Sequence, residues 1–406
     1  MGKPKIRFKG YEDDWEQRKF GEIVEKYEDL VETPTEGYTR LGIRSHAKGT
    51  FHSFVEKGKE LETAKMFRVA ADKFIVNITF GWEHAVAITD ENDAGKLVSH
   101  RFPQYSFNAG MVPKFFRYVI LDENFKHHLE LSSPGGAGRN RVLKLNDMLE
   151  YKMNFPSEVE QGKIAAYFDY LDHLITLHQR KCEETKSLKK YMLQKMFPEN
   201  GKCVPKIRFS GFSDDWEQRK LGELGSLKNG MNFSKDAMGH GFHFVNLQNI
   251  FGNNVVNVNA LGLADATEKQ LLEYTLIEGD VLFVRSSVKL EGVGEAALVP
   301  ESLENTTYSG FIIRFRDEYG LNNDFKKYIF GTQKVRNQIM SQATNSANKN
   351  ISQGVLENLT FEVPSFDEQA KIGEFFTNLD YLITLHQHKC DELQKLKKFM
   401  LQNMFV

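Results

Sequence analysis

The heptapeptide DDWEQRK stands at Asp13–Lys19 and returns, letter for letter, at Asp214–Lys220 of a chain of 406 residues. The likeness extends beyond the heptapeptide, because residues 4–23 and 205–224 differ at only 5 of 20 positions. A solenoid would show such self-similarity roughly every 20 to 50 residues throughout the chain. Here the repeat returns once, 201 positions later, so we treat it as one segment in two copies and name it the A segment.

A second segment, named the B segment, also occurs twice. Residues 160–197 and 368–405 lie 208 positions apart and differ at 14 of 38 positions. The intervening stretches, about 24–158 and 225–366, share little sequence, and we name them X and Y. The chain therefore has the order A–X–B–A–Y–B, which predicts a constant frame that carries two different domains.

The B segment has the periodicity of a coiled-coil helix. Its seam residues alternate at spacings of four and three, and this 3.5-residue period is typical of helices that pack along one shared seam. A proline precedes each helix at a position where proline is tolerated. We predict that the two helices bury each other through two sets of residues: Ile164, Phe168, Leu171, Ile175, His178, Cys182 and Thr185, and Ile372, Phe376, Leu379, Ile383, His386, Cys390 and Leu393.

The histidines and cysteines of this seam admit a second interpretation. His178 with Cys182, and His386 with Cys390, stand four residues apart, so each pair lies on one helix face, as metal ligands do. All four residues lie in the seam itself, which favours burial between the helices. We therefore predict no metal site.

Composition sets limits on the kind of protein. Apolar residues make up 41% of the chain, enough for globular cores, and no apolar run has the roughly 20 residues of a membrane span. The polar N-terminus predicts no secretion signal, and three cysteines fit a reducing cytosol. We expect a cytoplasmic protein without a membrane partner. The net charge of −2 gives no global argument for nucleic acid, so any DNA contact requires local positive charge.

X and Y both have the pattern of mixed α/β domains. In Y, strand-like runs lie at residues 242–250, 280–288, 296–300 and 309–315, and one amphipathic helix is predicted from Phe325 to Ile339. In X, we predict the corresponding strands at residues 72–80, 84–90 and 115–121.

Positive charge gathers where each domain leads into its B segment. Residues 325–356 contain five Lys or Arg and no acid, and residues 125–146 contain four against one Glu. A solvated helix face explains one such run, but two at matched positions favour nucleic acid, because Lys and Arg contact phosphates and Asn and Arg read base edges. The candidate DNA-binding residues are Arg40, Arg44, Arg101, Arg139, Asn140, Arg141, Arg285, Ser286, Lys334, Arg336, Asn345, Asn348, Lys349 and Asn350.

The sequence offers no catalytic centre. The acids and lysine of the A segment weakly match the site of metal nucleases, but their spacing is wrong for it. There is no phosphate-binding Walker loop, no motif for amino-methylation of a base, and no zinc-finger spacing. We predict instead that Trp15 and Trp216 are equivalent apolar anchors, and we assign no catalytic residue.

The A and B segments closely resemble those of the specificity subunits of bacterial type I restriction–modification enzymes. The resemblance rests on PKIRFxGFxDDWEQRKLGEL before a variable domain and on EQxKI…FFxxLDxLITLHQ…KLKKxMLQxMF after it, and it covers the whole chain. It implies two globular α/β target-recognition domains, joined by two long antiparallel coiled-coil helices in a pseudo-two-fold circular arrangement. The implied domain limits are 1–158, 159–198, 199–366 and 367–406.

The resemblance also implies a function and partners. Each recognition domain would read one half of a bipartite asymmetric site in double-stranded DNA. The repeated segments would dock two methyltransferase subunits, and two restriction subunits would complete the complex. S-adenosylmethionine, ATP and Mg²⁺ would bind those partners, and this chain would bind no cofactor. The residues expected at coiled-coil and docking contacts are Trp15, Trp216, Phe168, Leu171, Ile175, Phe376, Leu379 and Ile383.

X departs from the family pattern. X has NITFGWEHA where Y has the more usual GDVLFVRSS, so the site residues in X are less certain to correspond to those of the family.

Two functions other than DNA specificity stay open. One alternative is a metal-dependent nuclease that uses the Asp-Asp-x-Glu clusters. The other is a structural coiled-coil adaptor with no DNA role.

Overall fold

The chain folds into two compact units in a computed structural model. Unit 1 comprises Met1–Leu177 with Lys389–Val406, and unit 2 comprises His178–His388. None of the helices described combines the length and apolar character that crossing a bilayer requires. The structure describes residues 3–60, 65–135, 141–199, 201–344 and 347–405.

Unit 1 is built on three sheets. Their strand orders are β1-β11, β2-β10-β7-β8 and β3-β6-β9-β4-β5, and short helices connect and cover them. The strands are β1 (Glu16–Lys19), β2 (Val24–Tyr27), β3 (Leu30–Val31), β4 (Tyr38–Ile43), β5 (Thr50–Val55), β6 (Met66–Arg68), β7 (Lys73–Val76), β8 (Val86–Ile88), β9 (Leu97–Ser99), β10 (Gln104–Phe107) and β11 (Lys152–Phe155). The short helices are α1 (Phe20–Ile23), the 3₁₀ turn η1 (Gly81–Glu83), α2 (Pro113–Val119), α3 (Glu123–Leu131) and α4 (Leu145–Leu149).

Unit 2 contains four sheets. Their strand orders are β12-β22, β13-β20-β16-β18, β15-β14-β19 and β17-β21. The strands are β12 (Glu217–Lys220), β13 (Gly225–Asn229), β14 (Met238–Val245), β15 (Gly262–Ala264), β16 (Val281–Val284), β17 (Ser286–Ser287), β18 (Ala296–Leu298), β19 (Thr306–Tyr308), β20 (Ile312–Asp317), β21 (Lys349–Asn350) and β22 (Thr360–Val363). The short helices are α6 (Leu221–Leu224), α7 (Glu268–Glu273), α8 (Asn323–Ile329), α9 (Gln333–Gln342) and α10 (Gln353–Glu357). The 3₁₀ turns are η2 (Lys235–Ala237), η3 (Leu247–Asn249), η4 (Val258–Ala260) and η5 (Leu290–Gly292).

Each unit has its own four-stranded central sheet, and the two sheets have the same strand order although X and Y share little sequence. The order β2-β10-β7-β8 of unit 1 matches β13-β20-β16-β18 of unit 2, and every neighbouring pair in both sheets is antiparallel. The A segment enters each unit by the same route, because β1 pairs with β11 and β12 pairs with β22 in equivalent antiparallel registers. The differences between the units lie in the outer sheets.

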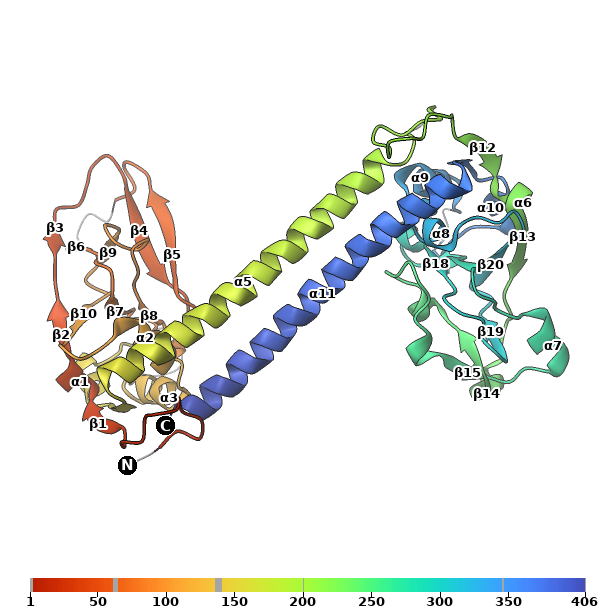
Figure 1. Cartoon of the computed structure of the whole chain (residues 1–406). Coiled ribbons are helices and arrows are strands. Elements are labelled where there is room, and N and C mark those ends of the chain that lie inside the picture. Colours follow the sequence, from red (N-terminus) through yellow and green to blue (C-terminus); the bar gives the residue numbers. More distant parts are fainter. Residues whose placement is uncertain (1–2, 61–64, 136–140, 200, 345–346, 406) are drawn as a thin grey trace. The chain divides into compact units, whose positions relative to one another are not determined.

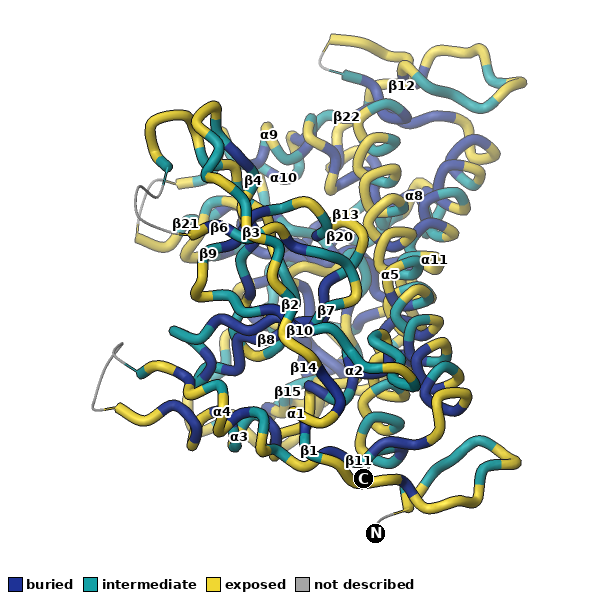
Figure 2. The backbone as a smooth tube through the Cα atoms, turned by 90° about the vertical axis from the view of Figure 1, so that its left-hand side faces the viewer, coloured by how far each residue is buried: buried dark blue, intermediate teal, exposed yellow. Residues whose placement is uncertain are grey.

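The B segments form the two long helices, α5 (Glu158–Lys195) and α11 (Phe366–Met404). Each unit holds one part of each helix. Inside unit 2 these parts run antiparallel, since His178 meets His386 whereas Lys189, further along α5, pairs with Asp380, further back along α11. Along both helices buried positions alternate with exposed ones (Figure 2), as the heptad pattern predicts.

Unit 1 also contains both chain ends. The backbone N–H of Ile6, in the first A segment, donates to the carbonyl of Asn403 near the end of α11 at 2.9 Å (Figure 1). The same bond recurs in unit 2, where the N–H of Ile207 donates to the carbonyl of Lys195 at 2.9 Å. Each copy of the A segment therefore lies against the last turn of one long helix.

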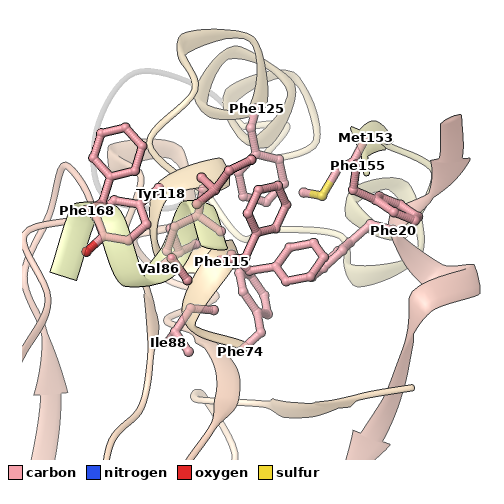
Figure 3. Packing of buried hydrophobic residues seen from close by; sticks show 14 of the residues in the cluster. Phe20, Phe74, Val86, Ile88, Phe115, Tyr118, Phe125, Met153, Phe155 and Phe168 are labelled. Carbon is pink, nitrogen blue, oxygen red and sulfur yellow. The ribbon is translucent and has the colours of Figure 1, made fainter. Parts of the chain in front are cut away.

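Aromatic side chains dominate the core of unit 1. Phe20 packs edge-to-face on Phe74 with ring centroids 4.8 Å apart, and Phe125 lies 6.0 and 6.3 Å from those two rings (Figure 3). This arrangement satisfies the electrostatic preference of aromatic rings for tilted contacts. The core also receives residues of both long helices, among them Phe168 and Leu393.

Two predicted elements differ from the structure, one in kind and one in its continuity. Residues 115–121, predicted as a strand, belong mainly to the helix α2, because Pro113 occupies a helix N-terminal position and the run is buried along one face. The single helix predicted from Phe325 to Ile339 is two helices, α8 and α9, that break at Gly331 and Thr332. A short apolar run alone does not separate strand from helix.

Candidate functional site

A buried ion pair fixes each A segment to the start of a long helix. The Arg7 guanidinium donates from Nε and Nη2 to the two Glu160 carboxylate oxygens at 2.7 and 2.8 Å, and Arg208 makes the same bidentate pair with Glu368 at the same distances. Both glutamate side chains are at most 1% exposed. The hydrogen bond that each guanidinium donates to its carboxylate raises the pKa of the arginine. The two parallel hydrogen bonds of such a bidentate pair fix the orientation of the guanidinium relative to the carboxylate.

The heptapeptide completes the same contact. Arg7 also donates to the backbone carbonyl of Asp13 at 2.5 Å, and Arg208 to that of Asp214 at 2.7 Å. The first aspartate of DDWEQRK therefore contributes its backbone, and its carboxylate takes no part in the ion pair.

The tryptophans of the two heptapeptides are buried equivalently. Trp15 is 1% exposed and meets Phe115 and Phe405 edge-to-face at 6.1 and 6.2 Å. Trp216 is 2% exposed and meets Phe197 in the same way at 6.1 Å. Phe405 and Phe197 are the corresponding last residues of the two B segments. Each tryptophan thus ties the end of one long helix to the rest of its unit, whereas its role in docking a partner stays a prediction.

A tyrosine, an aspartate and a lysine form a third repeated contact. In unit 1 the Tyr118 hydroxyl donates to Asp172 at 3.2 Å, and Lys397 pairs with the same carboxylate at 2.5 Å. In unit 2 the Tyr328 hydroxyl donates to Asp380 at 2.9 Å, and Lys189 pairs with that carboxylate at 2.5 Å. Burial raises the pKa of both tyrosines.

The seam histidines meet each other directly. His178 Nδ1 and His386 Nδ1 are 3.0 Å apart. One of the two rings therefore donates its Nδ1–H, and the Nδ1 of the other ring accepts it. Cys182 lies beside them, with Sγ 3.9 Å from the Ile383 carbonyl. Within the described residues no group of three or more His, Cys, Asp or Glu side chains is arranged to hold a metal ion.

In unit 1 the predicted DNA-binding arginines divide between two places. Arg40 and Arg44 lie on and just after β4, where Arg40 Nε donates to Ser53 Oγ at 2.8 Å and the Arg44 guanidinium lies 5.4 Å from the Phe51 ring centroid. Arg101 is exposed in the turn before β10.

Arg141 lies elsewhere in unit 1, and its guanidinium stacks on an aromatic ring. It is 5.5 Å from the ring centroid of Trp82, and its Nε donates to the Ser133 carbonyl at 3.0 Å. Arg139 and Asn140, predicted beside it, lie outside the described residues. Trp82 was absent from the predicted site, although its place in NITFGWEHA, where X departs from Y, was the available signal.

In unit 2 one small sheet gathers several predicted residues. β17 and β21 pair Ser286 with Asn350, and Ser287 with Lys349, so the two predicted stretches 285–286 and 348–350 are neighbours. Arg285 donates from Nη1 to the Gly310 carbonyl at 3.4 Å. Asn348 lines an adjoining hollow of about 550 Å³ together with Val288 and Phe311. Asn345 lies outside the described residues.

Two lysines of the predicted basic run in Y are paired with acids inside the unit. Lys326 is 4% exposed, pairs with Asp317 at 3.2 Å and donates to the Gly279 carbonyl at 2.8 Å. Lys334 pairs with Glu362, whose side chain is 3% exposed. Counting charges within residues 325–356 missed these acids because Asp317 and Glu362 lie just outside that run.

Arg336, in the same run, also bonds inside unit 2. Its Nη2 donates to the Glu291 carbonyl at 2.6 Å, and its Nη1 is buried without a hydrogen-bond partner among the described residues. Burial lowers the pKa of this guanidinium. Lys334 and Arg336 thus stabilise the fold of unit 2, while contact of either with DNA stays a prediction.

Comparison with known proteins shows similarity to one family of DNA specificity proteins. A sequence profile of the type I restriction modification DNA specificity domain matches residues 213–395. The MjaVIII type I restriction enzyme specificity subunit of Methanocaldococcus jannaschii is 21% identical over 287 residues, 69% of this chain and 67% of that protein. The EcoKI specificity subunit of Escherichia coli is 26% identical over 151 residues, 37% of this chain and 32% of that protein.

The alignments leave part of each relative uncovered. The MjaX specificity subunit of Methanocaldococcus jannaschii is 24% identical over 205 residues, and the aligned stretch spans 48% of its length and 50% of this chain. The chain therefore spans about half the length of this relative and a third to two thirds of the other two.

Solved structures share the fold along the whole chain. The HsdS subunit of Thermoanaerobacter tengcongensis matches with a TM-score of 0.52 at 16% identity, over 97% of both chains. The S subunit of a type I restriction-modification system from M. genitalium matches with a TM-score of 0.56 at 14% identity, over 100% of this chain and 99% of that one. At these identities the likeness establishes the fold.

Proposed function

The chain belongs to the family of type I restriction–modification specificity subunits, and on that premise we propose that it selects the DNA sequence on which such a complex acts. Units 1 and 2 each carry one target-recognition domain, and each domain reads one half of a bipartite asymmetric site. The chain itself is non-catalytic.

The observation that carries this proposal is the repeated frame around unlike domains. The pairs Arg7–Glu160 and Arg208–Glu368 have the same geometry, and Trp15 and Trp216 are buried against equivalent rings. Two identical partners require two identical docking surfaces, whereas two different half-sequences require two different readers. A frame that is constant to this degree beside divergent outer sheets meets both requirements.

We propose that α5 and α11 form one antiparallel coiled coil that separates the recognition domains in a pseudo-two-fold circular arrangement. The equivalent bonds Ile6–Asn403 and Ile207–Lys195 support it, since each A segment meets the end of one long helix. Two readers on one face of B-DNA lie about one helical turn apart, ~34–36 Å between half-site centres. Changing the helix length by a turn is then expected to change the non-specific spacer and neither half-sequence.

The partners follow from the same frame. Two methyltransferase subunits would dock at the repeated segments, and two restriction subunits would join through them. S-adenosylmethionine, ATP and Mg²⁺ would be bound by those partners. Because this chain has a net charge of −2, the methyltransferase subunits would supply most of the positive charge that contacts the DNA.

The two rival functions have a direct test at the heptapeptide. A nuclease would lose all cleavage on replacement of Asp215 by Asn and Glu217 by Gln while its assembly stayed intact. A specificity subunit retains its cleavage pattern in that variant, because Glu217 pairs with Arg219 on the surface at 2.7 Å and contacts no reacting group. A structural adaptor would leave the target sequence independent of this chain altogether.

Genome-wide mapping of N6-methyladenine in strains with and without this chain tests the proposed function. We expect a bipartite motif with a fixed non-specific spacer that is present only when the chain is expressed with its methyltransferase. An unchanged methylation map in the two strains would contradict the proposal.

A further inference from the structure

One tyrosine of each unit joins the domain between the repeats to both long helices. In unit 1, Tyr118 lies on α2, within X, and its hydroxyl reaches Asp169 at 2.8 Å and Asp172 at 3.2 Å on α5. Lys397, on α11, pairs with Asp172 and also stands over the Tyr118 ring, with its Nζ 5.4 Å from the ring centroid. Three segments of the chain therefore meet at one tyrosine that is 6% exposed.

Unit 2 repeats this contact with the parts of the two helices exchanged. Tyr328, on α8 within Y, donates to Asp380 of α11 at 2.9 Å, and Lys189 of α5 pairs with that carboxylate at 2.5 Å. The Lys189 Nζ lies 5.1 Å from the centroid of the Tyr328 ring. Thr377 takes the position of Asp169, with its Oγ1 3.4 Å from the tyrosine hydroxyl. We name these two matched sets the triads: Tyr118, Asp172 and Lys397, and Tyr328, Asp380 and Lys189.

The helix that carries each tyrosine also meets the A segment. In each unit the phenylalanine three residues before the tyrosine packs edge-to-face on the tryptophan of the heptapeptide, Phe115 on Trp15 at 6.1 Å and Phe325 on Trp216 at 6.2 Å. Residues three apart in a helix lie on one face. One face of α2 and one face of α8 are thus held by the repeated frame at two points, one apolar and one polar, although X and Y share little sequence.

The position of a recognition domain on the long helices determines where its half-site must lie. One additional base pair in the spacer of B-DNA moves a half-site by about 3.4 Å along the axis and turns it by roughly 35° about the axis. A domain that is held rigidly cannot follow these movements, whereas a domain that can tilt follows part of them. Discrimination between spacer lengths therefore depends on the contacts that join each domain to the helices.

We propose that Tyr118 and Tyr328 are positioning residues that restrict the complex to one spacer length. The inference rests on the proposed function, because it takes the two domains as readers of one bipartite site. Each tyrosine acts through its hydrogen bond to the aspartate of its triad, and a hydrogen bond to a charged acceptor is among the stronger ones in proteins. The lysine, from the other long helix, holds that aspartate in place.

The double variant Tyr118→Phe with Tyr328→Phe removes the two hydroxyls and little else. The first ring keeps its contact with Phe168, whose centroid is 4.8 Å away (Figure 3), and the second keeps its contact with Phe376 at 5.1 Å. Each aspartate keeps its lysine. We therefore expect the double variant to fold and to assemble with the methyltransferase subunits.

The test uses the full chain assembled with its methyltransferase subunits. The duplexes carry the mapped site with its natural spacer, or with a spacer one base pair longer or shorter, and initial rates of adenine methylation give kcat/KM for each duplex. In the double variant the preference for the natural spacer is expected to fall about ten-fold, since one hydrogen bond to a charged group is worth roughly that factor or more. The rate on the natural site should change much less, because both readers remain intact.

Tyr151→Phe is the matched control in unit 1. Its hydroxyl donates to Asp122 at 2.8 Å, and both residues belong to X. The variant therefore removes a bond of the same kind that does not reach a long helix. It should lower the melting temperature and leave the spacer preference unchanged. Tyr118→Phe and Tyr328→Phe are also measured singly, and each should relax the preference by about three-fold.

An unchanged spacer preference in the double variant would overturn the proposal. Equal relaxation by Tyr151→Phe would overturn it too, because a general loss of stability would then explain the effect. If the double variant does not assemble, an unchanged preference in both single variants has the same meaning. The proposed function stands in each of these cases as long as the native chain directs methylation to a bipartite motif, and it falls only if that motif is absent.

Discussion

At the scale of single residues, the repeated ion pair carries the clearest energetic consequence. Glu160 is fully buried, so Glu160→Ala leaves the Arg7 guanidinium without its partner inside the protein. We expect a loss of about 3 kcal/mol in the free energy of unfolding of unit 1, measured by urea denaturation. The matched control is Glu56→Ala, which breaks an exposed pair with Lys59 and should cost at most about 1 kcal/mol. Equal effects of the two substitutions would contradict the structural role assigned to Arg7.

His84 gives unit 1 a predictable dependence on pH. It is 3% exposed, its Nε2 donates to the Ile120 carbonyl at 2.7 Å, and burial lowers its pKa below the ordinary 6.5. Below pH ~6.5 the unfolded chain therefore binds a proton that the folded chain does not, so stability falls as pH falls toward the lowered pKa. The effect cannot exceed about 1.4 kcal/mol per pH unit.

Urea denaturation at pH 7.5 and 5.5 measures this loss. His84 has a positive φ of 60°, a conformation that asparagine tolerates, so His84→Asn is the suitable control. The variant should lose the part of the pH dependence that is due to this ring. If native chain and variant weaken equally between pH 7.5 and 5.5, the assignment to His84 is wrong.

At the scale of elements, the long helices depend on their seam. Phe376 is 0% exposed and packs against Phe197 and Tyr328 with ring centroids 6.0 and 5.1 Å apart. Phe376→Ala is expected to lower the free energy of unfolding of unit 2 by about 3–5 kcal/mol, the usual cost of the cavity that replaces a buried phenylalanine. Tyr381, on the same helix and 65% exposed, supplies the control, and Tyr381→Ala should change stability by less than about 1 kcal/mol. Thermal unfolding followed by circular dichroism separates the two outcomes.

The elements also show what the sequence could predict. The seam residues Phe168, Leu171 and Phe376 are buried as the 3.5-residue period predicts, because a repeat sustained over many turns has few alternative structures. The strand predicted at 115–121 failed because six apolar residues fit either period. The pairing of Lys334 with Glu362 could not be predicted from the basic run in Y, because the glutamate lies outside that run. A hollow of about 360 Å³ in unit 1 had no sequence signal, because its lining comes from several separate strands and turns between residues 38 and 102.

At the scale of the whole molecule, a net charge close to zero predicts that tight DNA binding depends on the partner subunits. The net charge is −2, and several basic residues of Y are paired internally, so the isolated chain should bind DNA weakly and lose that binding steeply with salt. Fluorescence anisotropy with the chain alone and with its methyltransferase subunits measures the difference. Sub-nanomolar, salt-insensitive binding by the isolated chain would contradict this expectation.

The matched basic positions should matter only in the assembled complex. Arg141 stacks on Trp82 in unit 1, and Lys349 lies in the small sheet of unit 2. Charge reversal to glutamate at either position is expected to weaken DNA binding by the complex, since each lysine or arginine on a phosphate contributes to counterion release. The decrease should be about ten-fold or more, and Lys57→Glu, on an exposed pair in unit 1, is the control. No change in either variant would favour a structural adaptor.

The central claim is that a constant frame carries two independent readers. It is tested most directly by replacing residues 225–358 with the corresponding domain of another specificity subunit and mapping N6-methyladenine in cells that express the chimera. The account predicts that one half of the bipartite motif changes while the other half and the spacer stay the same. A chimera that folds and methylates DNA with both halves changed, or with neither changed, would contradict it.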